Sequence, residues 1–125
     1  MKHHVAILLW ATDPDAPHRC ATPFFHAAAA AAMDAEVEIY FTSASVKLLA
    51  KGVAESLPTG PRERETVYAF MQRAAEHGAK FYVCSQAMEE HDVAEKDFIP
   101  EVTGIAGAVV YMARCMDDDW VTLTY

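Results

Sequence analysis

The stretch KFYVCSQAM, residues 80–88, passes from an apolar segment into a polar one at a single cysteine. Its first part is rich in residues that favour β-strands, whereas Ser85 to Met88 has the character of a helix start. Cys84 is therefore the expected junction between a strand and a helix. Strands that alternate with helices in this way are typical of a parallel sheet covered by helices.

The rest of the chain repeats this alternation. The pattern predicts strands at 5–10, 36–42, 80–84, 102–105 and 120–124. Helices or helical turns are predicted at 22–34, from 43 or 45 to 51, and at 62–77, 85–91, 93–99 and 107–116. Thr22 is the expected N-cap of the first helix, and the six alanines Ala27 to Ala32 indicate close packing on the sheet or on another subunit. The predicted fold is a three-layer α/β/α domain with a five-stranded parallel sheet, and residues 1–125 are expected to form this single domain.

The charge and the hydropathy of the chain both limit what kind of partner the protein can bind. The net charge of −8 argues against nucleic acid and against an anionic membrane surface, because both need a basic face on the protein. The longest apolar run stays well short of the roughly 20 residues needed to cross a bilayer. The opening MKHHVAILLWATDPDAP lacks a small-residue cleavage site and is interpreted as the first strand of a cytoplasmic protein.

Three cysteines at wide spacing do not form a disulfide framework. Cys84 is the candidate nucleophile, because the N–H groups and dipole of a helix N-terminus favour a thiolate over a thiol. A buried cysteine that only packs is the competing interpretation. Cys115 is expected to pack within its helix. Cys20 is either a resolving thiol on the same sheet edge or a residue near a helix start, and the second is favoured.

The carboxyl ends of the predicted strands define where a ligand would bind in such a sheet. Small or polar residues gather there, and those expected to line a pocket or hold an anion beside Cys84 are Thr12, Ser43, Ser85, Gln86, Gly104 and Gly107. The segment 104–107 lacks the spacing of a phosphate loop, so nucleotide binding is a minor hypothesis. The six histidines show no metal-binding spacing, and no metal is expected.

Two segments resemble the DsrE/DsrF/DsrH-like family. One is KFYVCSQAMEEHDV with the following FIPEVTGIAGAVVYMARCMDDDWVTLTY, and the other is the opening strand with TDPDAPHRCATPFFHAAAAAAM and EVEIYFTSASVKLL. The resemblance implies a five-stranded parallel α/β protein that forms trimers or hexamers and acts in cytoplasmic sulfur metabolism. The family cysteine maps onto Cys84. The resemblance implies that members with this cysteine are sulfur carriers, which take persulfide sulfur from a TusA-like or rhodanese-like donor and pass it to an acceptor. Such a transfer between thiols needs no metal or organic cofactor.

Three hypotheses follow from the residues and the resemblance. The first is a sulfur-relay protein, a sulfurtransferase in the sense of a persulfide carrier, with Cys84 as the carrier. The second is a non-catalytic oligomeric scaffold or binding module in which Cys84 is inert. The third is a thiol-redox protein in which Cys20 resolves an oxidised Cys84.

Overall fold

A computed structural model describes residues 3–62 and 64–125 of the chain. It contains a five-stranded sheet in the order β4-β3-β2-β1-β5, and each pair of neighbouring strands is parallel. The strands are β1 (His4–Leu9), β2 (Glu36–Phe41), β3 (Lys80–Val83), β4 (Val102–Ile105) and β5 (Trp120–Thr124). The predicted fold class is confirmed, and each strand lies within two residues of its predicted position.

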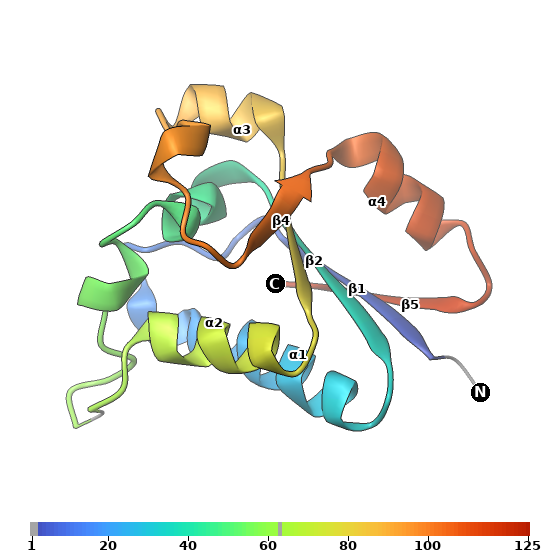
Figure 1. Ribbon diagram of the computed structural model, residues 1–125, viewed down its shortest axis with the longest axis horizontal. Coiled ribbons are helices and arrows are strands. Elements are labelled where there is room, and N and C mark those ends of the chain that lie inside the picture. Colours follow the sequence, from blue (N-terminus) through green and yellow to red (C-terminus); the bar gives the residue numbers. More distant parts are fainter. Residues whose placement is uncertain (1–2, 63) are drawn as a thin grey trace.

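The helices cover the two faces of the sheet unequally. Helices α1 (Ala21–Ala32) and α2 (Val67–Glu76) lie together against one face, whereas α4 (Ala108–Cys115) lies alone against the other (Figure 1). The six-residue α3 (Ser85–Glu90) continues β3 at its carboxyl end, and short 3₁₀ helices occupy Pro17–Arg19, Ser43–Leu49, Ala54–Ser56 and Glu95–Asp97. Among the helices of residues 3–62 and 64–125, none is long and apolar enough to cross a membrane.

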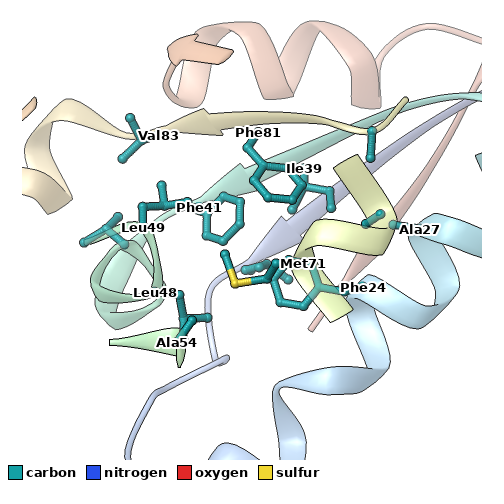
Figure 2. Close-up of a cluster of buried hydrophobic side chains, with 14 of the residues drawn as sticks. Phe24, Ala27, Ile39, Phe41, Leu48, Leu49, Ala54, Met71, Phe81 and Val83 are labelled. Carbon is teal, nitrogen blue, oxygen red and sulfur yellow. The ribbon is translucent and has the colours of Figure 1, made fainter. Parts of the chain in front are cut away.

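The main core lies between the sheet and the α1–α2 pair. Alternate residues of the central strands point into it, among them Ile39, Phe41 and Phe81, and these meet Phe24 of α1 and Met71 of α2 (Figure 2). All five side chains are fully buried. Because side chains alternate along a strand, the intervening residues face α4 and form a separate, smaller cluster.

Two helix starts differ from the prediction. Cys20, not Thr22, is the N-cap of α1, and Thr22 lies exposed inside the helix. Helix α2 begins at Val67 rather than at residue 62, with Thr66 as N-cap accepting a hydrogen bond from the Ala69 N–H at 3.3 Å. The segment before it pairs with itself through an antiparallel bridge between Pro58 and Thr66, which keeps it out of the helix. Residue 63, within the predicted helix, lies outside the described residues.

The alanine-rich helix α1 was expected to pack closely on the sheet or on another subunit, and the structure shows packing on the sheet. Ala27 is fully buried in the main core, and Ala30 and Ala31 pack against that core. Small side chains thus allow α1 to lie close to the sheet. Ala29 and Ala32 are exposed, and packing of this outer side on another subunit stays a prediction.

Candidate functional site

The β3–α3 junction holds Cys84 at the carboxyl end of the sheet. Cys84 is the N-cap residue of α3, and its backbone N–H donates to the carbonyl of Phe41, the last residue of β2, at 2.9 Å. Its own carbonyl accepts from the Met88 N–H at 3.1 Å. These two hydrogen bonds fix the backbone on both sides of the thiol, while the residue remains partly exposed. The junction predicted from the sequence is therefore present.

Cys84 lies on the walls of two different cavities. The first has a volume of about 250 Å³ and lies between the sheet and α4; Tyr40, Thr42, Gly107, Tyr111 and Met112 are among the residues that line it with Cys84. The second is more open and polar, has a volume of about 190 Å³, and is lined by Thr42, Ser43, Cys84, Gln86, Ala87 and Glu90. Cys84 therefore borders an apolar cavity and a polar cavity.

Aromatic side chains, among them Tyr40 and Tyr111, line part of the first cavity. Tyr40 stacks on Tyr82 of the neighbouring strand and meets the edge of Tyr111, with ring centroids 5.4 Å apart in both pairs. Burial raises the pKa of Tyr40, and the hydrogen bond to Glu38 raises it further. Burial also raises the pKa of Tyr111, to about 12. Both rings are consequently uncharged at physiological pH.

An ion pair ties α4, the outer wall of this cavity, to the sheet. Arg114 donates to both carboxylate oxygens of Glu38, at 2.9 and 3.2 Å, and its guanidinium lies 4.2 Å from the ring centroid of Trp120. Tyr40 donates to the same carboxylate at 2.6 Å. Burial alone would raise the pKa of Glu38, but the hydrogen bonds from Arg114 and Tyr40 lower it overall. This buried carboxylate therefore remains charged and holds α4 in place.

The other two cysteines have different surroundings. Cys20 is fully buried, and its thiol donates to the carbonyl of Asp13 at 3.3 Å. Burial raises the pKa of Cys20 to about 11, so that the thiolate is disfavoured at neutral pH. Cys115 is exposed at the end of α4, so the prediction that it packs is wrong. Arg114, the residue before it, contacts Glu38 of the sheet, whereas the Cys115 side chain lies on the exposed side of the same turn.

The structure distributes the other predicted site residues as follows. Ser43 and Gln86 line the polar cavity with Cys84, and Gly107 lines the apolar one. The residues lining these two cavities do not include Thr12, Ser85 or Gly104; Thr12 is buried, and Ser85 is exposed.

Several lining residues were not anticipated from the sequence. Tyr40, Tyr111 and Met112 belong to the apolar cavity, and Glu90 belongs to the polar one. The alternation along β2 could have placed Tyr40 on the face opposite Phe41. Nothing local to α4 indicates that Tyr111 and Met112 line a cavity with Cys84. Within the described ranges, no cluster of three or more His, Cys, Asp or Glu side chains is placed to hold a metal ion.

The fold and the site together define an α/β protein with a thiol at the carboxyl end of a parallel sheet. The model of the DsrE/DsrF-like family matches residues 4–120, and the chain belongs to this family. The ychN protein from E. coli has a similar structure, with a TM-score of 0.75, 14% identity and complete coverage of both chains. A protein of unknown function from Methanobacterium thermoautotrophicum has a TM-score of 0.72 at 14% identity, covering 98% of this chain and 99% of its own. None of the curated proteins gives a sequence match.

Proposed function

We propose that the protein is a sulfur-relay protein in which Cys84 carries persulfide sulfur from a donor protein to an acceptor protein. The observation that carries this proposal is the placement of Cys84. Of the three cysteines, it is the one that is partly exposed and lies on the walls of cavities. Membership of the DsrE/DsrF-like family supports the same assignment.

The transfer is a thiol exchange without net oxidation. The Cys84 thiolate attacks the outer sulfur of a donor persulfide, the donor S–S bond breaks, and the donor leaves as a thiolate. Cys84 now carries a persulfide. An acceptor thiolate then attacks its outer sulfur and releases Cys84 in its original state. The step requires an accessible thiol and a docking partner, and it uses no metal or organic cofactor.

We also propose a sulfur donor, a cellular compartment and an oligomeric state for the carrier. The donor is a TusA-like or rhodanese-like protein, the relay operates in the cytoplasm, and the carrier is a homo-oligomer, a trimer or a hexamer. Exposed apolar side chains on α4 and at its C-cap support self-association, because Val109 and Met116 are 85% and 77% exposed.

Mass spectrometry of the intact protein tests the carrier role. The wild type, Cys84→Ser and Cys115→Ser are each incubated with a rhodanese that has been loaded with thiosulfate. We expect the wild type and Cys115→Ser to gain the mass of one sulfur atom and Cys84→Ser to gain none. Sulfur loading of Cys84→Ser, or no loading of the wild type, would contradict the proposal.

The thiol-redox hypothesis makes a different prediction for Cys20. A resolving thiol must reach Cys84 as a nucleophile, whereas Cys20 is buried in the core with a raised pKa. We therefore expect mild peroxide to leave no Cys20–Cys84 disulfide in the native protein. Peptide mapping under non-reducing conditions gives the answer, and an abundant Cys20–Cys84 peptide would favour the redox role.

A further inference from the structure

The cavity between Cys84 and α4 differs from the rest of the protein in its lack of charge. The chain carries a net charge of −8, yet none of the described residues that line this cavity is Asp, Glu, His, Lys or Arg. Its volume is about 250 Å³. A protein cavity of about 150 Å³ is large enough to bind benzene, so this one has room for an aromatic ring with a short side chain.

The walls are mostly carbon and sulfur, and the lining residues that carry hydroxyl groups are Tyr40, Thr42 and Tyr111. The Tyr40 hydroxyl is already used, since it donates to Glu38, and the ring itself contacts Tyr82 and Tyr111. Met112 contributes a thioether, which adapts well to apolar and sulfur-containing ligands. A charged group placed here would lose its hydration without gaining a counter-ion, whereas an apolar group would leave water favourably.

The polar cavity on the other side of the thiol also disfavours anions. Its described lining contains the carboxylate of Glu90 and the uncharged side chains of Ser43 and Gln86, but no Lys or Arg. A negatively charged substituent therefore meets no cation among the described residues on either side of Cys84. The two cavities together favour a ligand that is uncharged where it contacts the apolar walls.

Building on the proposed function, we propose that the apolar cavity binds the uncharged organic substituent of a low-molecular-weight persulfide, R–S–SH. Cys84 thereby exchanges sulfur with a small apolar thiol in addition to its protein partners. The Cys84 thiolate attacks the outer sulfur, the S–S bond of the ligand breaks, and R–S⁻ leaves with the bonding electron pair. The Cys84 persulfide forms, and no oxidant or reductant is consumed.

Methanethiosulfonate reagents test the class of substituent without depending on sulfur transfer. The Cys84 thiolate attacks the sulfur that carries R, the mixed disulfide Cys84–S–S–R forms, and methanesulfinate leaves. The folded protein reacts with the benzyl, methyl or sulfonatoethyl reagent, and the rate of modification is read from the peptide that contains Cys84 after digestion. Each rate is divided by the rate of the same reagent with 2-mercaptoethanol, which corrects for differences in intrinsic reactivity. We expect the benzyl reagent to be faster than the methyl and sulfonatoethyl reagents by about tenfold or more.

Matched variants of α4 assign this preference to the cavity. Ala108→Phe adds a ring to a residue that lines the cavity, and Ala113→Phe makes the same change on the same helix at an exposed residue outside it. Gly107→Val is a second filling variant, since an added Cβ there meets no atom within 4 Å. We expect Ala108→Phe and Gly107→Val to bring the benzyl-to-methyl ratio close to one, and Ala113→Phe to keep the wild-type ratio.

The outcomes separate this proposal from the proposed function. Equal benzyl and methyl rates in the wild type would overturn the ligand class, and so would a ratio that both filling variants leave unchanged. Neither result would affect sulfur loading of Cys84 from a rhodanese. Conversely, a benzyl preference that the filling variants abolish would support the cavity as a binding site even if no sulfur were transferred. Circular dichroism of each variant establishes that it is folded before its rates are compared.

Discussion

The two faces of the sheet are built from the same strands but differ in composition. The face toward α1 and α2 is closed by aromatic and aliphatic side chains such as Phe24, Phe41 and Phe81, all fully buried. The face toward α4 carries Tyr40, Tyr82 and the Glu38–Arg114 pair, and it includes the apolar cavity beside Cys84. We infer that the first face supplies most of the stability, whereas the second leaves room for a ligand.

This difference follows from how each face is covered. Two packed helices exclude water from a sheet face, and the side chains between them fill the space closely. A single helix of eight residues leaves part of the opposite face uncovered, so α4 depends on specific contacts to stay in position. The Arg114 side chain supplies two of these, one to Glu38 and one to the face of Trp120. The weaker packing on this side is what allows a cavity to form next to the thiol.

Adjacent residues of β3 provide the strongest test of the comparison. Phe81 is fully buried toward α1 and α2, whereas Tyr82 faces α4 and is only partly buried. We expect Phe81→Ala to lower the free energy of unfolding by about 4 kcal/mol, since a large buried ring leaves a cavity behind. Tyr82→Ala should cost about 1.5 kcal/mol, because less apolar surface is lost. Denaturant unfolding of both variants gives the values, and equal costs would contradict the assignment of stability to one face.

The ion pair under α4 should have an intermediate effect. Arg114→Met removes two charge-assisted hydrogen bonds and leaves the Glu38 carboxylate, whose side chain is 11% exposed, with one fewer partner. We expect it to lower the free energy of unfolding by about 2 kcal/mol. The double variant Glu38→Gln/Arg114→Met should recover part of this loss, because no unpaired charge remains. Strictly additive costs in this double-mutant cycle would show that the pair is not coupled.

The same pair predicts a pH dependence. The pKa of Glu38 in the folded protein lies below its ordinary value of 4.5, so folding favours the charged form. Its stabilising contribution is therefore fully present above that ordinary value and is lost as the pH falls through the lowered one. We expect the difference in unfolding free energy between the wild type and Glu38→Gln to be constant near neutrality and to shrink below about pH 4.5. A difference that grows on acidification would contradict the lowered pKa.

The sequence predicted the strands better than it predicted the site. Continuous or alternating apolar runs such as Trp120–Thr124 identify a strand directly, because the polarity of each residue indicates which face of the sheet its side chain occupies. The position of Cys84 was predictable for the same reason, since it follows the last buried residue of β3. By contrast, the apolar cavity depends on where α4 lies over the sheet, and the contacts that hold it there join residues far apart in the sequence: Arg114 and Glu38, for example, are 76 residues apart. The late start of α2 likewise depends on a bridge between Pro58 and Thr66 that no local pattern indicates.

The outer surfaces of the two helix layers allow a last comparison, with the smallest expected effect on stability. Val109 is 85% exposed in the first turn of α4, and Ala29 is exposed on α1. Val109→Glu and Ala29→Glu should each change the free energy of unfolding of the subunit by less than about 0.5 kcal/mol. Their effects on self-association should differ. If copies of the chain meet through the apolar side of α4, a charge at Val109 must be desolvated in the contact and will weaken it, whereas one at Ala29 will not. Sedimentation velocity of the two variants distinguishes these surfaces.

Loss of association in Ala29→Glu alone would instead assign the contact to the alanine-rich helix, and the α4 side would then be free to admit ligands to Cys84.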